Sequence, residues 1–229
     1  MKIFADTANV NELRELDEMG LICGVTTNPT ILSREGPDAI NSLRQIRNLL
    51  FNYPILAQVV ATDHKGMVEE GRMIKAVGPQ LVVKIPATNE GIKAIATLKK
   101  ENIRTCATAI LTSAEALLCA AAGADYVAPY TGQNNIIGFD GLATVREIAA
   151  MLAIGKIKCQ ILAASIDKPQ DIVDVAVAGA HIATLTYAQL IAVCDKPAPL
   201  TNYYVDNFLA DWNKAGAYFR SIPVIDKTS

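Results

Sequence analysis

The chain has 229 residues, of which 51% are hydrophobic, and 21 Lys and Arg against 23 Asp and Glu give a formal net charge of −2. This length and apolar content exclude a disordered chain, because a domain of this size buries most of the apolar surface that it would expose when unfolded. Neither sign of charge dominates. The composition therefore argues against a partner such as nucleic acid or a membrane surface and favours a small molecule.

The five cysteines are scattered along the chain and form no CxxC pair. An odd number of cysteines without metal-ligand spacing is typical of reduced thiols in a cytosolic protein. The N-terminal residues contain no apolar segment of the kind found in secretory signals, and no apolar run reaches the roughly 18 residues that a membrane-spanning helix needs. We therefore expect a soluble, cytoplasmic protein.

Eight short apolar segments are expected to form strands. Most are nearly continuous runs rich in β-branched residues, which is typical of parallel strands covered on both faces. In chain order they are residues 2–6, 22–28, 55–61, 81–87, 104–110, 126–130, 160–165 and 181–186.

Amphipathic segments between these strands are expected to form helices, namely residues 9–20, 37–51, 63–78, 89–101, 112–124, 141–153 and 168–180. Thr112 or Ser113 can cap the fifth of them, and Pro169 suits the first turn of the seventh. The even alternation predicts a single α/β domain over residues 1–229, a (β/α)8 TIM barrel, in preference to a doubly wound open sheet.

Residues 201–219 are expected to add a C-terminal helix beyond the barrel. This segment carries the only Trp and six of the thirteen aromatic residues. An aromatic helix with nothing left to cover inside the barrel suggests a contact between subunits, so we expect a homo-oligomer.

The active site of a (β/α)8 barrel lies at the C-terminal ends of the strands. Polar residues that interrupt or close the expected strands are therefore the candidates for a site, namely Asp6, Thr26, Asn28, Gln58, Lys84, Thr108, Tyr130 and Ser165.

Lys84 is the most informative candidate because it lies within the apolar segment LVVKIPA. Burial inside a barrel disfavours the charged ammonium and makes a nucleophilic amine available. A lysine at a strand end could instead extend its amine to solvent, and the strand alone does not separate the two interpretations. For Asp6, a role as the cap of the next helix is slightly favoured over a role as general acid or base. Asn9 could provide that cap instead.

The other candidates each have an ordinary interpretation. Asn28 before Pro29 is typical of a turn, although its amide could also bind a polyol. Gln58 between apolar neighbours implies internal water or a ligand. Thr108 and Tyr130 could carry hydroxyls into the same cavity, although threonine is common in strands.

His64 and His181 are interpreted as structural, and the sequence has no metal-ligand spacing. We expect a mechanism that needs no metal, no cofactor and no histidine base. A lysine on the fourth strand among polar strand ends suits Schiff-base chemistry on a carbonyl substrate.

The segments DTANVNEL, GVTTNPTIL, LVVKIPAT, YVAPY and LAAS resemble the transaldolase family, and in particular its small subfamily that includes fructose-6-phosphate aldolase. The resemblance extends over nearly the whole chain and implies a class I, metal-free aldol enzyme on a (β/α)8 barrel. It implies that Lys84 forms the Schiff base and that Asp6 transfers the proton. Asn28 would bind donor hydroxyls.

The resemblance further implies that Gln58, Thr108 and Tyr130 hold a catalytic water. Transaldolases usually have Glu at position 58, Asn at 106 and Phe at 130, whereas this chain has Gln58, Cys106 and Tyr130. The residues at these three positions are similar to those of the aldolase branch, so the resemblance favours reversible aldol cleavage as the reaction. Transfer of a three-carbon unit between sugars is the first alternative, and a non-catalytic sugar-binding barrel is the second.

Members of the family usually carry an Arg shortly after strand six that grips the substrate phosphate together with a Ser of strand seven. Here Gln133 replaces this Arg, Ser165 remains and Asp167 follows it. Because a neutral amide replaces a planar cation, we expect weak binding of phosphorylated acceptors. Lys168 in the same loop could substitute for the Arg. Small family members also form pentamers or decamers, which implies the same for this chain.

Overall fold

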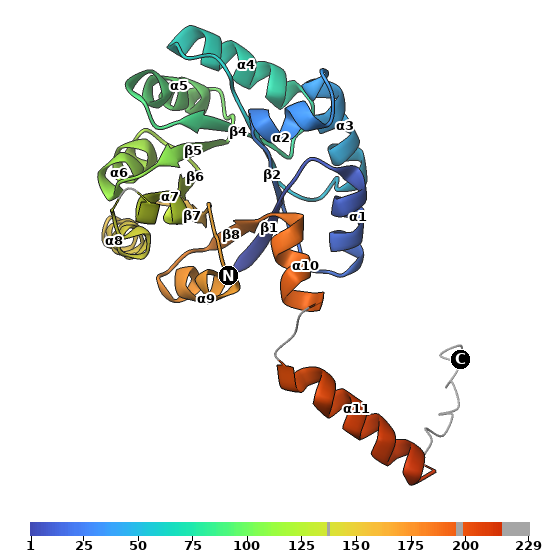
Figure 1. Cartoon of the computed structure of the whole chain (residues 1–229). Helices are drawn as coiled ribbons and strands as arrows, with labels where there is room; N and C mark the ends of the chain where they lie inside the picture. The colour runs from blue at the N-terminus through green and yellow to red at the C-terminus, as the bar shows by residue number, and fades with distance from the viewer. Residues whose placement is uncertain (137, 196–198, 217–229) are drawn as a thin grey trace, which may run out of the picture. The chain divides into compact units, whose positions relative to one another are not determined.

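Eight parallel strands pair in chain order and close into a barrel, with the first strand hydrogen-bonded to the eighth. The computed structural model describes residues 1–136, 138–195 and 199–216, except for the side chains of residues 133, 134, 195 and 199. Figure 1 shows the strands as a ring surrounded by helices. The predicted (β/α)8 barrel is confirmed, and the doubly wound sheet is excluded by the closure.

The strands are β1 (Lys2–Asp6), β2 (Val25–Thr26), β3 (Ile55–Gln58), β4 (Leu81–Pro86), β5 (Thr105–Ile110), β6 (Tyr126–Pro129), β7 (Gln160–Ala163) and β8 (Ile182–Leu185). The helices are α1 (Val10–Glu18), α2 (Pro29–Arg34), α3 (Ala39–Leu49), α4 (His64–Ala76), α5 (Asn89–Lys100), α6 (Ser113–Ala121), α7 (Thr131–Ile136), α8 (Gly141–Ile154), α9 (Pro169–Val177), α10 (Tyr187–Asp195) and α11 (Pro199–Lys214).

Most of the barrel helices begin at a side chain that accepts a hydrogen bond from a backbone N–H of the first turn, which satisfies a donor that the helix itself cannot. These caps are Asn9, Asn28, Asp38, Asp63, Thr88, Thr112 and Asp140. Thr112 forms the predicted cap, in a reciprocal capping box with Glu115. Pro169 occupies the first turn of α9, also as predicted.

The interior of the barrel below the site is packed with apolar side chains from most of the strands. They are Phe4, Leu56, Val82, Cys106, Tyr126, Ala128, Leu162, Ala164 and Ile182. Gly24 has a specific role here, because a Cβ at this position would collide with the ring of Phe4. This apolar plug separates the two ends of the barrel.

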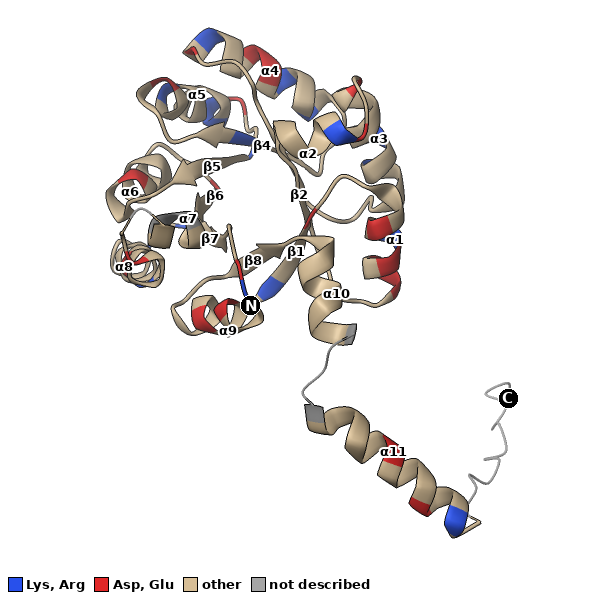
Figure 2. Ribbon diagram, in the orientation of Figure 1, with Lys and Arg blue, Asp and Glu red and all other residues tan. Residues whose placement is uncertain are grey.

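Charged residues lie mainly on the helices, whereas the strands are mostly uncharged (Figure 2). Within the eight strands, the charged residues are Lys2 at the N-terminal end of β1, Asp6 at its C-terminal end, and Lys84 near the C-terminal end of β4. Asp6 and Lys84 thus stand at the end of the barrel where this fold places its chemistry.

The chain divides into two compact units, Met1–Leu190 and Ile191–Ser229. The second unit contains α11, where a C-terminal helix was predicted over residues 201–219; residues 217–219 lie outside the described part. Its large apolar side chains are exposed, including those of Tyr204, Phe208 and Trp212. No helix in the described part of the chain is long and apolar enough to cross a membrane.

Candidate active site

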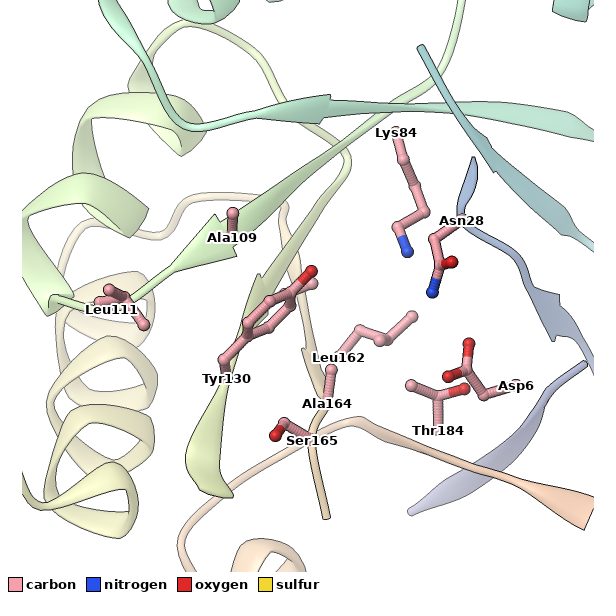
Figure 3. A pocket seen from close by; sticks show the side chains of 11 residues that line it. Asp6, Asn28, Lys84, Ala109, Leu111, Tyr130, Leu162, Ala164, Ser165 and Thr184 are labelled. Carbon is pink, nitrogen blue, oxygen red and sulfur yellow. The ribbon is translucent and has the colours of Figure 1, made fainter. Parts of the chain in front are cut away.

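A cavity of about 470 Å³ opens at the C-terminal ends of the strands. Its polar lining residues come from six strands or the loops that directly follow them, namely Asp6, Asn28, Lys84, Tyr130, Ser165 and Thr184. Figure 3 shows Lys84, Asn28 and Asp6 along one side, with the Tyr130 hydroxyl reaching in from the other. Five of these six residues, all except Thr184, were predicted from the sequence as candidates for the site.

Lys84 is buried, with only 6% of its surface exposed, so its amine does not extend to solvent. Its Nζ atom donates a hydrogen bond of 3.0 Å to the carbonyl oxygen of Thr27. This carbonyl is neutral, and no ion pair to Lys84 is found in the described part of the chain. The lysine therefore presents its amine to the cavity without a carboxylate bound to it.

Asp6 does not cap α1, so the slightly favoured interpretation of this residue was wrong. Asn9 provides that cap by accepting hydrogen bonds from the N–H groups of Asn11 and Glu12. Asp6 is left free to face the cavity, where its Oδ1 atom accepts a hydrogen bond of 2.6 Å from the Thr26 hydroxyl.

A chain of hydroxyls holds the Asp6 carboxylate. The hydroxyls of Thr26 and Thr184 lie 2.6 Å apart. Thr26 has a single proton, and an ionised Asp6 can only accept. Thr184 must then donate to Thr26, which donates to Asp6. The carboxylate is thereby fixed from one side and keeps its other oxygen for a ligand.

Asn28 has both roles that its sequence context allowed. Its Oδ1 atom accepts a hydrogen bond of 2.9 Å from the N–H of Ile31 and so caps α2, which begins at Pro29. The expected turn is therefore the first turn of a helix. Because the carbonyl oxygen is used, the amide NH2 group is the part that remains for a ligand in the cavity.

Tyr130 and Thr108 are joined by a hydrogen bond of 3.1 Å between their hydroxyls. Thr108 is fully buried beneath the cavity. Gln58 is half-buried and pairs in register with Lys84 on the neighbouring strand. Gln58 and Thr108 thus lie on β3 and β5, the strands on either side of β4, and Tyr130 follows β6.

Two residues that line the cavity have left-handed backbone conformations, Ala109 with φ of 56° and Ser165 with φ of 58°. Ala109 lies where the pairing of β5 with β6 shifts register. A bulge of this kind redirects neighbouring side chains, and backbone strain in non-glycine residues often occurs at functional sites.

Cys106 lies inside the apolar plug and is fully buried. Burial raises the pKa of its thiol to about 12, which keeps it protonated and unreactive at neutral pH. Cys106, a candidate substrate-binding residue by the family resemblance, is not among the residues that line the cavity and packs in the apolar plug instead. The side chain of Gln133 lies outside the described part of the structure.

The loop after β7 brings a negative charge close to the cavity. A Cβ on Gly132 would collide with the Asp167 carboxylate and with the carbonyl of Ser165. The N–H of Gly132 donates to that carbonyl over 2.7 Å. The Asp167 carboxylate therefore lies against the first turn of α7, beside a residue that lines the cavity.

The sequence profile of a family described as transaldolase/fructose-6-phosphate aldolase matches residues 3–219. The chain belongs to this family.

Relatives of similar length carry the name probable transaldolase. The protein from Halalkalibacterium halodurans is 43% identical over 93% of this chain and 99% of its own. One from Clostridium acetobutylicum is 42% identical over 94% and 99%, respectively. Among solved structures, inosine 5′-monophosphate dehydrogenase from Legionella pneumophila has a TM-score of 0.59 at 14% identity. The match covers 82% of this chain and 58% of that one, and it supports the fold alone.

Thr184, which completes the hydroxyl chain in this member of the transaldolase/fructose-6-phosphate aldolase family, was not predicted from the sequence. Its position two residues after Ile182, a plug residue, places it on the inner face of β8 by strand alternation. That alternation was available in the sequence. The described residues also contain no group of three or more His, Cys, Asp or Glu side chains that could hold a metal ion.

Proposed function

We propose that this enzyme of the transaldolase family is a class I aldolase that reversibly joins a dihydroxyacetone or hydroxyacetone donor to an aldehyde. The observation that carries this proposal is the buried Lys84 amine, which faces the same cavity as the Asp6 carboxylate and the Tyr130 hydroxyl. A barrel that only binds sugars has no need for a buried amine, so this arrangement argues against the non-catalytic alternative.

The reaction begins when the Lys84 amine adds to the ketone carbon of the substrate. Loss of water then gives an iminium ion, and its positive nitrogen accepts the electron pair of the carbon–carbon bond that breaks. Asp6 takes the proton from the hydroxyl of the carbon that leaves as an aldehyde. The enamine that remains is protonated and hydrolysed to release the donor ketone, and synthesis follows the same steps in reverse.

Tyr130 is the acid that assists loss of water from the carbinolamine. Its hydroxyl is oriented by Thr108, and Gln58 lies beside Lys84 on the adjacent strand. We assign these three residues to holding the water that leaves and later returns. Asn28 would orient the donor hydroxyls through its free amide NH2 group. Thr26 positions Asp6.

The acceptor aldehyde is expected to be non-phosphorylated. The charged groups that line the cavity within the described part of the chain are Asp6 and Lys84, and both are assigned to the reaction. Gln133 offers no charge at the position where the family has Arg, and the Asp167 carboxylate beside Ser165 would repel a phosphate. Lys168, which follows Asp167 in the same loop, could offset this repulsion.

Steady-state kinetics of aldol addition test the acceptor preference. We expect a lower KM for glyceraldehyde than for glyceraldehyde 3-phosphate with dihydroxyacetone as donor. The variant Gln133→Arg with Asp167→Asn should lower the KM for the phosphorylated aldehyde about tenfold or more, since a hydrogen bond to a charged group contributes about 1.5–3 kcal/mol. A tight KM for glyceraldehyde 3-phosphate in the unaltered enzyme would contradict the expectation.

The names of the relatives support transaldolase activity as the second candidate. A coupled assay separates the two, with fructose 6-phosphate supplied alone or together with an acceptor sugar phosphate such as erythrose 4-phosphate. Release of dihydroxyacetone and glyceraldehyde 3-phosphate without an acceptor supports the aldolase. Turnover only in the presence of the acceptor would establish the transferase instead.

A further inference from the structure

Two further cavities lie at the opposite end of the barrel, where the strands begin. One, of about 380 Å³, is lined by Met1, Lys2, Gln160 and His181, together with Ala180. The other, of about 450 Å³, shares Gln160 and His181 with it. We call the two together the N-terminal cavity. The apolar plug of the barrel separates it from the candidate active site.

Positive charge predominates in the N-terminal cavity. Lys2, Arg104 and Lys158 line it, together with one acidic residue, Asp125. Across the described residues, none of these three cationic side chains forms an ion pair. Their charges are therefore not neutralised by the protein itself.

The acidic residue that lines the N-terminal cavity, Asp125, already has hydrogen-bond and ion-pair partners. Asp125 accepts a hydrogen bond of 2.9 Å from the N–H of Thr105 on one oxygen and a contact of 3.3 Å from the Lys99 amine on the other. Its negative charge is thus shared with a lysine outside the cavity lining. A bound anion could therefore contact Lys2, Arg104 and Lys158, because the Asp125 carboxylate is already paired with Lys99 and competes little for these cations.

The neutral groups of the cavity lining also act as donors. The Nδ1 atom of His181 accepts a hydrogen bond of 3.0 Å from the N–H of Ile161, so the neutral ring carries its proton on Nε2. Burial raises the pKa of the Tyr126 hydroxyl, and the Arg104 guanidinium nearby partly opposes that rise. Tyr126 therefore stays a protonated donor at neutral pH.

Arg104 is held in position by a hydrogen bond of 3.2 Å from its guanidinium to the carbonyl oxygen of Gln80. A guanidinium has five N–H donors in a planar fork, so this contact leaves others for a ligand. The same fork matches the oxygens of a phosphate, which is one reason why Arg is common in phosphate sites.

We propose that the N-terminal cavity binds the phosphoryl group of a small molecule, held by Arg104, Lys158 and the Nε2–H of His181. Phosphoryl oxygens are negatively charged and accept hydrogen bonds, so they match the cations and N–H donors of this cavity. The volume admits a phosphate ester of sugar size as well as free phosphate. This site is independent of the aldol chemistry proposed at the other end of the barrel.

Isothermal titration of the full chain at constant ionic strength tests the site, with inorganic phosphate and glycerol phosphate as separate probes and chloride as the reference anion. Glycerol phosphate has no carbonyl and cannot form an imine with Lys84. We expect both probes to bind more tightly than chloride. Tighter binding of glycerol phosphate assigns the site to a phosphate ester, and equal binding assigns it to free phosphate.

The variant Arg104→Gln with Lys158→Gln should weaken phosphate binding at least about tenfold, as expected for the loss of hydrogen bonds to charged groups. The matched control Arg44→Gln with Lys65→Gln removes the same charge from exposed positions on α3 and α4 and should leave binding unchanged. Lys158→Gln alone, at an exposed residue, should weaken binding without disturbing the Arg104 contact.

Two results would overturn the proposal. The first is phosphate binding no tighter than chloride binding in the unaltered protein. The second is equal phosphate affinity in the Arg104 and Lys158 variants and in the unaltered protein, because the anion would then bind elsewhere. Neither result bears on whether Lys84 forms an imine, so the aldolase proposal is tested separately.

Discussion

The Asp6 carboxylate shows how single hydroxyls prepare a reactive group in this barrel. Thr184 donates to Thr26 and Thr26 donates to Asp6, so the carboxylate is oriented before any substrate arrives. Such pre-organisation lowers the cost of placing a general base correctly in the transition state. Thr184 acts through its neighbours and is a positioning residue.

The variant Thr184→Val tests this role. Valine has nearly the same shape but cannot donate to Thr26, so we expect kcat for aldol cleavage to fall about three- to tenfold, as for one lost hydrogen bond of about 1 kcal/mol. The KM should change little and imine trapping on Lys84 should persist.

The conservative variant Thr184→Ser keeps the hydroxyl and should restore most of the lost kcat. If Thr184→Val and Thr184→Ser lowered kcat equally, the shape of the side chain would account for the effect. That result would contradict a role for the hydroxyl chain.

At the scale of single elements, β5 carries a feature that the fold does not explain. Thr105 is fully buried at the start of this strand, and its Oγ1 atom has no hydrogen-bond partner within the described part of the protein. A buried hydroxyl without a partner loses its hydration and gains nothing in return.

The variant Thr105→Val should therefore stabilise the protein by about 1 kcal/mol, because valine replaces the hydroxyl with a methyl group of similar size. This corresponds to a rise in Tm of about 2–4 °C for a domain of this length. Thermal unfolding followed by circular dichroism at one fixed protein concentration measures it.

Thr144→Val is the matched control, because the buried Thr144 hydroxyl donates a hydrogen bond of 3.1 Å to the carbonyl of Asp140. This variant should leave Tm unchanged or lower it. A lower Tm for Thr105→Val would contradict the interpretation of an unsatisfied hydroxyl.

The regular strands and helices could be predicted from the sequence because each is long enough to show a recognisable hydrophobic periodicity. Three helices were not predicted from the sequence, namely α2, α7 and α10.

Helices α2 and α7 have only six residues each, less than two full turns, so no apolar stripe can be recognised in their sequences. The Asn28–Pro29 step was interpreted as a turn, although Asn as a cap and Pro in the first turn also begin a helix. Helix α10 has little amphipathic pattern, because apolar residues occupy most of its length.

The ends of the strands were predicted less well than their centres. Strand β2 contains only Val25 and Thr26, whereas the apolar run predicted a strand over residues 22–28. Where a strand stops depends on the partner strand and on the following helix cap, and neither is encoded locally. For the same reason, the competition between Asp6 and Asn9 for capping α1 could be resolved only by the three-dimensional arrangement.

On the scale of the whole molecule, α11 offers an apolar surface that we propose packs against another copy of the chain. Tyr204 stacks on Phe208 with ring centroids 6.1 Å apart, and both residues are exposed, as is Trp212. Aromatic residues are enriched at the centres of protein interfaces. Assembly through this helix would bury them.

Light scattering coupled to size-exclusion chromatography tests this proposal. The unaltered protein should have a mass several times the 24.5 kDa of one chain, as in the pentamer or decamer that the family resemblance implies. Tyr204→Glu with Phe208→Glu should reduce this mass, because two buried charges would oppose assembly.

Asn202→Glu with Asn207→Glu adds the same charge to α11 at polar positions and serves as the control, which should keep the assembled mass. A monomeric unaltered protein would contradict the proposal, as would an unchanged mass in the Tyr204 and Phe208 variant.

Borohydride reduction in the presence of dihydroxyacetone, followed by peptide mass mapping, tests the central proposal most directly. If Lys84 forms an imine, reduction fixes the donor on its Nζ atom, and the peptide that contains Lys84 gains the mass of the reduced adduct. The variant Lys84→Met should show no adduct while its circular dichroism spectrum stays native. A folded, unaltered protein that gives no adduct on Lys84 would contradict the Schiff-base mechanism.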